Sequence, residues 1–145
     1  MVVIDNIKNN EYQIVYNLAG KIDGITQHAE HVYKIMSVHF TDTFFIAKVP
    51  KENGILKIAG YMMGYISQSY KGQLFIWQIA VSDEFKRKGI GNRLLNHTVN
   101  SARSKAGCTA LMATVETGNI PSQKLFEKVG FKIESCRFAC PNQEL

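Results

Sequence analysis

Hydrophobic residues recur with two different periods along the first half of the chain. Spacings of three and four residues are typical of amphipathic helices, whereas short runs rich in β-branched and aromatic residues are typical of strands. The predicted elements are a strand at residues 2–4, helices at 11–18 and 28–40, and strands at 43–49 and 56–67. The residues expected on the buried face of the second helix are Val32, Ile35, Met36 and His39.

Proline and glycine mark the ends and irregularities of these predicted strands. Pro50 is expected to end the strand at 43–49, and residues 51–54 form a hairpin turn with glycine at its end. Gly60 and Gly64 fall inside the next strand, where an isolated glycine indicates a bulge or the close approach of another backbone.

Strands and helices alternate through the second half of the chain. The pattern predicts strands at 74–81, 111–115 and 131–138, a helix at 91–106 that ends at Gly107, and a last helix that begins near Pro121. The apolar face of the 91–106 helix consists of Ile90, Leu94, Leu95, Val99 and Ala102. The order predicts an α/β (α+β) fold with a mixed sheet, and 145 residues suit one domain spanning 1–145.

The turn between the 74–81 strand and the following helix has the features of an anion site. Gly89 and Gly91 have no Cβ, so a phosphate can approach the main chain closely. The first N–H groups of a helix have no partner inside the helix, and the helix dipole adds positive charge there. Lys86, Arg87 and Lys88 add mobile positive charge, so the turn is predicted to hold a pyrophosphate.

Two common phosphate-binding motifs are excluded by the residues of this turn. A nucleotide-hydrolysing P-loop reads GxxxxGK[ST], and the chain has no such match. A dinucleotide fingerprint reads GxGxxG, but Gly91 is followed by Asn92, Arg93 and Leu94 without a third glycine.

The turn resembles the acyl-CoA loop of the GNAT N-acetyltransferase superfamily, usually written [R/Q]-x-x-G-x-[G/A]. The run from Lys86 to Gly91 matches it, except that Lys86 stands where Arg or Gln is usual and so lacks the planar fork of Arg. The superfamily also carries a strand, then N-x-x-[A/S], then a helix that ends in a Gly-Phe pair. The residues on that second pattern are Asn119, Ser122, Gly130 and Phe131.

The resemblance covers about residues 55–138 and extends more weakly to one group within the superfamily. The Trp77–Val81 segment, the Ala-Thr-Val end of the 111–115 strand and the Ser-x-x-Leu-Phe helix are similar to diaminobutyrate acetyltransferases of ectoine synthesis. The resemblance implies a GNAT-like, mostly antiparallel central sheet flanked by helices, with acetyl-CoA as cosubstrate. The residues that it implies for acetyl-CoA binding are Ile79, Ala80, Val81, Lys86, Arg87, Lys88, Gly89, Ile90, Gly91, Asn92, Asn119 and Ser122.

Proton transfer is the part of this chemistry that the sequence assigns least directly. An alkyl amine has a pKa of about 10.4, so a base or a water chain must take its proton. Many relatives place a Glu on the strand before the loop, but Gln78 occupies that neighbourhood here, and Glu116 is the preferred substitute; a solvent-facing turn residue is the alternative. His28 and His31 lie on the segment that usually covers the acceptor, where packing or surface roles are more common.

Aromatic residues bear on the general acid and on the acceptor pocket. Many relatives carry a Tyr on the last helix as general acid, but Phe126 stands in that region and has no proton to give. Tyr61 or Tyr65 could replace it, although cross-strand packing is the stronger expectation. Trp77 is expected mainly in the core, with a place in the acceptor pocket as the alternative.

Composition narrows the remaining choices. The net charge of +5 could indicate nucleic acid, but the basic residues gather around one loop and helix, which CoA explains, so no nucleic-acid partner is expected. Three cysteines argue against a disulfide framework, and Cys136 and Cys140 lack nearby ligands, so no metal is expected. Without a secretory signal or a membrane-length apolar run, we expect a cytoplasmic protein without a membrane partner; a homodimer stays open.

The leading hypothesis is an acetyl-CoA-dependent enzyme that acetylates a primary amine of a small metabolite, such as a diamino acid or polyamine. A protein or peptide N-acetyltransferase is the first alternative, and it requires an open groove beside residues 28–41. A non-catalytic acyl-CoA-binding module is the second, because Gln78 and Phe126 stand where relatives carry acid–base residues.

Overall fold

The computed structural model describes residues 1–105, 107–115 and 118–132. In these residues five strands form one sheet in the order β1-β2-β3-β4-β5, with β5 parallel to β4 and the other pairs antiparallel. The strands are β1 (Val3–Asn6), β2 (Phe44–Pro50), β3 (Leu56–Ile66), β4 (Gln73–Val81) and β5 (Ala110–Ala113). The predicted mixed, mostly antiparallel sheet is therefore confirmed.

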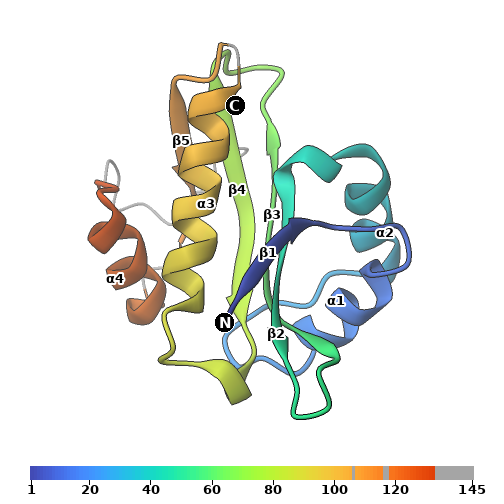
Figure 1. Ribbon diagram of the computed structural model, residues 1–145. Helices are drawn as coiled ribbons and strands as arrows, with labels where there is room; N and C mark the ends of the chain where they lie inside the picture. The colour runs from blue at the N-terminus through green and yellow to red at the C-terminus, as the bar shows by residue number, and fades with distance from the viewer. Residues whose placement is uncertain (106, 116–117, 133–145) are drawn as a thin grey trace.

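Helices cover the two faces of this sheet. They are α1 (Tyr12–Ala19), α2 (Glu30–His39), α3 (Ile90–Ser104) and α4 (Ile120–Val129), with short 3-10 turns at Thr41–Thr43 and Asp83–Phe85. In Figure 1, α3 crosses the sheet beside β4 with α4 beyond it, whereas α1 and α2 lie together on the side of β2 and β3. None of the described helices has the length and apolar character needed to cross a membrane.

The element boundaries agree with the sequence pattern to within a few residues. The strand β2 continues one residue past the expected end, because Pro50 still pairs with Leu56 across the hairpin. The predicted last strand at 131–138 falls outside the described residues from residue 133 onward.

Both glycine irregularities predicted in β3 are confirmed. The register of β2 and β3 shifts beside Gly60, and the register of β3 and β4 shifts beside Gly64. A Cβ on Gly60 would lie 2.7 Å from the Ala80 carbonyl oxygen, and one on Gly64 would lie 2.5 Å from the Phe75 carbonyl oxygen. Neighbouring backbone therefore occupies the space that any larger residue needs at both positions.

The second shift makes Trp77 an extra residue in β4. Met63 pairs with Gln78 and Gly64 pairs with Ile76, so Trp77 has no partner on β3. Because side chains alternate along a strand, an inserted residue exchanges the faces of the residues beyond it. Trp77 is 36% exposed, so the expectation of a core tryptophan is wrong.

The exchange is visible in the two hydrophobic clusters of the core. Before the bulge, Leu74 and Ile76 pack in the cluster under α3 and α4. After it, Ala80 belongs to the cluster under α1 and α2, and Gln78 reaches the same side. The bulge thus turns a polar side chain of β4 toward α2.

The helix α3 has most of the apolar face predicted for it. Ile90, Leu94, Leu95 and Ala102 are buried, as expected. The fifth buried residue is Thr98 rather than Val99, because the Thr98 hydroxyl donates a hydrogen bond to the Leu94 carbonyl at 2.8 Å and so needs no polar partner outside the helix.

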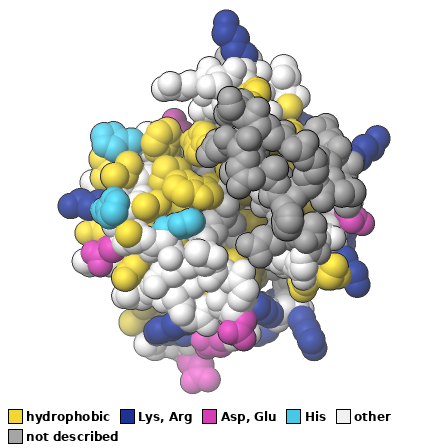
Figure 2. Space-filling view, turned by 180° about the vertical axis from the view of Figure 1, so that it is seen from behind, with side chains coloured by type: hydrophobic (Ala, Val, Ile, Leu, Met, Phe, Trp, Pro, Cys, Tyr) yellow, Lys and Arg dark blue, Asp and Glu magenta, His cyan; other side chains and the backbone are white. Residues whose placement is uncertain are grey.

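The helix α2 turns a different face to the sheet than its apolar spacing predicts. Tyr33, Met36 and Ser37 are buried, whereas Ile35 is 48% exposed and His39 is also exposed. Figure 2 shows histidine and hydrophobic side chains gathered on the side of the molecule that carries α1 and α2. Of the four predicted residues, Met36 is buried and Val32 packs against the cluster partly buried, whereas the expectation was wrong for Ile35 and His39. Tyr33 is buried instead, because the sheet offers its hydroxyl a polar partner.

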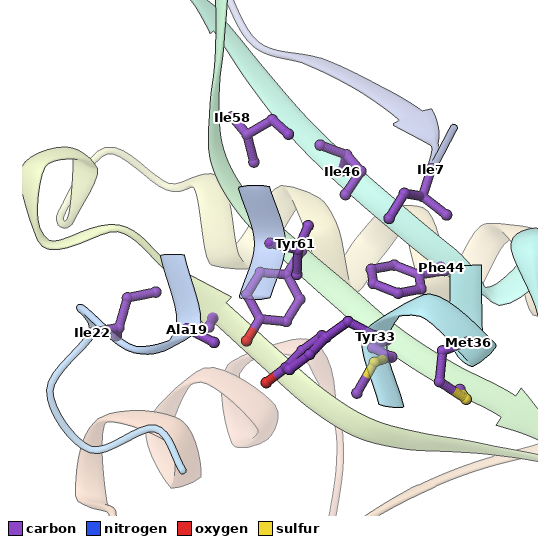
Figure 3. Packing of buried hydrophobic residues seen from close by; sticks show 12 residues of the cluster. Ile7, Ala19, Ile22, Tyr33, Met36, Phe44, Ile46, Ile58 and Tyr61 are labelled. Atoms are coloured by element: carbon purple, nitrogen blue, oxygen red, sulfur yellow. The ribbon is translucent and has the colours of Figure 1, made fainter. Parts of the chain in front are cut away.

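The cluster under α1 and α2 surrounds two buried tyrosines. Figure 3 shows Tyr33 from α2 and Tyr61 from β3 side by side, with their hydroxyl oxygens directed to the same side of the cluster. Their rings meet edge to face with centroids 6.4 Å apart, and neither side chain is exposed. The apolar residues around them include Ile7, Ile22, Met36, Phe44, Ile46 and Ile58.

Candidate functional site

The turn after β4 forms an open cradle of main chain. Gly89 is the N-cap of α3 and has a φ of +77°, a left-handed conformation that L side chains adopt only with strain. Arg87 also has a positive φ, of +65°. A Cβ on Gly89 would meet no atom within 4 Å, so the space in front of this backbone is free for a ligand.

The first turn of α3 carries N–H groups without a side-chain cap. Arg93 is the first residue whose N–H bonds back, to the Gly89 carbonyl at 3.0 Å. The N–H groups of Ile90, Gly91 and Asn92 are therefore directed toward the turn, where they and the helix dipole favour an anion.

Gly91 has a different reason for lacking a side chain than the sequence suggested. Its φ is not positive, and an added Cβ would lie 3.3 Å from a methyl of Leu125 on α4 and 3.6 Å from a methyl of Val81. Close packing of α3 against α4 and β4 thus accounts for Gly91. At Gly89 the reason is the left-handed backbone conformation of the turn.

The basic side chains of the turn are partly engaged with neighbouring residues. Lys86 forms an ion pair with Asp83 at 2.7 Å, and the Lys88 ammonium lies 5.6 Å from the centre of the Phe85 ring. The Lys57 ammonium hydrogen-bonds Glu84 at 2.6 Å and lowers the pKa of that carboxyl. Among the described residues Arg87 forms no ion pair, so its guanidinium is the least engaged charge of the triplet.

One edge of β4 is open beside this turn. The pairing of β4 with β5 covers Gln73 to Ile76 only, and within the described residues no strand pairs with the β5 side of Trp77–Val81. The Ser82 N–H donates to the Ala59 carbonyl of β3 at 2.7 Å. Because N–H directions alternate along a strand, Ala80 also points to β3, whereas the N–H groups of Ile79 and Val81 face the open edge.

The start of α4 is held by a side-chain cap. The Asn119 side-chain oxygen accepts a hydrogen bond from the Ser122 N–H at 3.3 Å, and Pro121 stands in the first turn, where its missing N–H is harmless. The cap gives Asn119 a structural role, whereas Ser122 takes part in it only through its main-chain N–H. A contact of Asn119 or Ser122 with a cosubstrate stays a prediction.

Of the acid–base candidates, Glu116 lies outside the described residues. Phe126 is 6% exposed and packs against Phe131, with ring centroids 5.0 Å apart, so it belongs to the core. Tyr65 packs against Phe75 at 5.5 Å, as its cross-strand position predicts. Within the described residues no cluster of His, Cys, Asp or Glu could hold a metal ion, and Cys108 is a free thiol.

Gln78 is the centre of a buried hydrogen-bond network that the sequence did not reveal. Its side-chain oxygen accepts hydrogen bonds from the hydroxyls of Tyr33 at 2.9 Å and Tyr61 at 2.6 Å. Its side-chain nitrogen donates to the Thr26 carbonyl at 2.9 Å. An ionised glutamate could accept both phenols but could not donate to Thr26, whereas the amide does both without a change of protonation.

Burial sets the ionisation of both phenols. It raises the pKa of Tyr61 and that of Tyr33, and for Tyr33 the hydrogen bonds of the network oppose the shift. Each phenol therefore stays protonated at neutral pH, and its proton is directed to Gln78. No sequence signal announces the network, because its members come from the segment before α2, from α2, from β3 and from β4.

A comparison with protein families decides the assignment. The model of the acetyltransferase (GNAT) family matches residues 10–131, most of the chain. This chain belongs to the GNAT acetyltransferase family. The resemblance inferred from the loop and from the second motif is thereby confirmed, as is the assignment to the acyltransferases.

Curated relatives of this GNAT protein are named L-2,4-diaminobutyric acid acetyltransferases. The protein of Virgibacillus pantothenticus is 29% identical over 126 residues, which are 87% of this chain and 76% of that protein. The protein of Wolinella succinogenes is 26% identical over 117 residues, 80% of this chain and 65% of that protein. The chain thus spans about two thirds to three quarters of the length of these relatives.

Solved structures share the GNAT fold with this chain. The diaminobutyrate acetyltransferase of Paenibacillus lautus, in complex with L-2,4-diaminobutyric acid and coenzyme A, superposes with a TM-score of 0.74 at 23% identity. It covers 89% of this chain and 74% of its own. The ribosomal-protein-S18-alanine N-acetyltransferase of Escherichia coli gives a TM-score of 0.73 at 19% identity, covering 93% and 80%. At these identities the likeness shows the fold alone.

Proposed function

We propose that this GNAT protein transfers acetyl from acetyl-CoA to a primary amine of a small metabolite. The observation that carries the proposal is the continuity of two main-chain features. The left-handed cradle at Gly89 lies directly beyond the open edge of β4, so one extended ligand can contact both. A cosubstrate with a pyrophosphate at one end of a long arm and a thioester at the other has that form.

The residues for acetyl-CoA then divide by the part of the molecule they contact. The pyrophosphate is held by the turn at Gly89 and by the N–H groups of Ile90, Gly91 and Asn92. The positive charges of Lys86, Arg87 and Lys88 partly neutralise the negative charge of the phosphates. Ile79 and Val81 bind the arm through main-chain N–H groups at the open edge. Asn119 and Ser122 flank the arm from the start of α4.

When bound, acetyl-CoA supplies an activated acetyl group with a thiolate leaving group. Main-chain N–H groups at the open edge donate to the carbonyl oxygen as negative charge develops on it, and fixed donors of this kind are effective because they need no reorganisation. Backbone performs this task whatever the side chains of β4 are.

The acceptor is proposed to be a diamino acid or polyamine, with L-2,4-diaminobutyric acid as the first candidate. The names of the curated relatives support this choice. A small acceptor also fits the hydrogen bond between Gln78 and Thr26, which holds the segment before α2 down against β4. A protein substrate would require that segment to stand away from the strand.

The proposal is tested by calorimetry with acetyl-CoA and by a thiol-release assay with two sets of acceptors. The first set contains L-2,4-diaminobutyric acid, lysine, ornithine and putrescine, and the second contains peptides with free N-termini. We expect acetyl-CoA binding and turnover with a member of the first set. Turnover with peptides alone would indicate a protein acetyltransferase, and absence of acetyl-CoA binding would overturn the proposal.

A further inference from the structure

His28 occupies a place that its sequence neighbourhood does not explain. It lies between α1 and α2, and its imidazole ring contacts the indole of Trp77 with ring centroids 4.9 Å apart. Trp77 is the bulged residue of β4 and is 36% exposed. Histidine and hydrophobic side chains lie together on the side of the molecule that carries α1 and α2 (Figure 2).

Two hydrogen bonds fix the main chain around His28. The His28 N–H donates to the Tyr33 hydroxyl at 3.3 Å, and the Tyr33 hydroxyl donates to Gln78 at 2.9 Å. Gln78 in turn donates to the Thr26 carbonyl, two residues before His28. The buried amide therefore anchors the segment on both sides of Gln27, and β4 determines where the imidazole lies.

The His28–Trp77 pair lies at one end of the open edge of β4. The open edge runs from Trp77 to Val81, about 13 Å of strand at the usual rise. The phosphate turn adjoins the Val81 end, so the arm of acetyl-CoA extends from there toward Trp77. The reactive end of the cosubstrate and the His28–Trp77 pair then lie at the same end of the edge.

From this geometry we infer that His28 is the proton relay of the transfer, and that Trp77 forms the wall of the acceptor-amine site beside it. The inference rests on the proposed function. Many relatives carry a tyrosine as general acid where this chain has the buried Phe126. A relay at His28 makes that tyrosine unnecessary, because one imidazole performs both proton transfers.

Two protons leave the acceptor nitrogen during the transfer. The acceptor ammonium loses one proton to water, and the neutral amine nitrogen forms the C–N bond to the carbonyl carbon. As that bond forms, a neutral nitrogen of His28 takes the second proton from the amine nitrogen. The C–S bond breaks with its electron pair on sulfur, and the imidazolium returns the proton to that sulfur, whose thiol pKa of about 8.5 exceeds that of imidazolium.

The surroundings of His28 keep it in the required form. Burial lowers its pKa below the ordinary 6.5, so the imidazole is neutral at pH 7. The titratable group that faces it from α2 is the Tyr33 phenol, whose pKa is raised, and β4 presents Trp77, which does not titrate.

The test compares His28→Gln with His31→Gln, an exposed histidine of the same segment that serves as the matched control. For L-2,4-diaminobutyric acid, or whichever amine of the panel turns over, H28Q is expected to lower kcat/KM by about 10²- to 10³-fold, and H31Q by less than about twofold. Acetyl-CoA affinity by calorimetry should be unchanged in both variants.

The pH profile separates a relay from a base that removes the first proton. In H28Q the loss should persist at high pH, because the relay acts on an amine that is already neutral. In Glu116→Gln, if Glu116 removes the first proton, the loss should shrink as pH rises. Free imidazole should restore part of the activity of His28→Ala.

A measurement without turnover completes the test. NMR titration of the histidine ring signals of the free protein, assigned with H28Q, should give His28 a pKa below 6.5, and addition of the acceptor should shift that signal but not the signal of His31. Equal kinetics of H28Q and H31Q in an active enzyme would overturn the relay and leave the proposed function standing. Acetyl-CoA binding by wild type without turnover on any amine would overturn both.

Discussion

The turn after β4, which is proposed to hold phosphate, and the region around Gln78, which is proposed to adjoin the acceptor, are built in opposite ways. The turn is one continuous segment in which main-chain N–H groups and a left-handed glycine form the proposed site, while Lys86 pairs with Asp83 and Lys88 lies over the Phe85 ring. The acceptor side joins side chains from separate elements, with Gln78 of β4 bonded to Tyr33 and Tyr61. The turn should therefore be sensitive to backbone changes, and the acceptor side to the removal of single polar atoms.

The largest expected effect is that of Gly89→Val. A β-branched residue strains the left-handed backbone and places methyl groups in the open space of the cradle. We expect acetyl-CoA affinity to fall by about 10- to 100-fold by calorimetry, as if one hydrogen bond to a charged oxygen were lost. Circular dichroism should show the fold retained.

Gly91→Ala is the matched control for that change. Its Cβ would meet a flexible Leu125 methyl at 3.3 Å, and its backbone is not left-handed. Acetyl-CoA affinity should stay within about threefold of wild type, a difference below 1 kcal/mol. If G89V and G91A weaken binding equally, the turn is not the backbone cradle described here.

The acceptor side is tested by Tyr33→Phe against Tyr61→Phe. Each variant removes one phenol that donates to Gln78, but only Tyr33 also accepts the His28 N–H. Both should lower the free energy of unfolding in urea by about 1 kcal/mol. Y33F should lower kcat/KM for the amine about tenfold, and Y61F less than about threefold, with acetyl-CoA affinity unchanged. Equal kinetic losses would mean that the network supports stability alone.

Asn119→Ala should have a smaller effect with two components. Loss of the cap on α4 should lower the free energy of unfolding by about 1 kcal/mol, and KM for acetyl-CoA should rise about threefold or more. Asn119→Ser keeps a good capping oxygen but removes the amide N–H₂ group. Recovery of stability with KM still raised supports a contact with the cosubstrate, whereas full recovery of both reduces Asn119 to a cap.

The smallest effect is expected from the lysine of the loop motif. Lys86 is paired with Asp83, so Lys86→Ala should change acetyl-CoA affinity by less than about twofold, as is usual for an exposed ion pair. Arg87→Ala should weaken binding more and reduce its dependence on salt, because no described carboxylate holds Arg87. The reverse order would show that the charge at position 86 is the one that contacts phosphate.

The same contrast explains how much the sequence could predict. The turn and the order of helices and strands along the chain were predictable because glycine spacing and hydrophobic periodicity are local properties of the chain, whereas the mostly antiparallel sheet was implied by the family resemblance. The acceptor side was not, because the bulge at Trp77 exchanges the faces of β4 and so turns Gln78 toward α2. Apolar spacing also misplaced part of the buried face of α2, since the hydroxyl of Tyr33 bonds a partner 45 residues away and its ring is buried in place of Ile35.

The most direct test of the central claim is a steady-state assay of wild-type protein with acetyl-CoA and the panel of small amines. Released thiol and acetylated amine are measured together, the latter by mass spectrometry. The account predicts saturable turnover with at least one diamino acid or polyamine, with one thiol released for each amide formed. Tight binding of acetyl-CoA with no thiol release above the rate of spontaneous hydrolysis, on any amine of the panel, would contradict it and indicate a non-catalytic acyl-CoA-binding module.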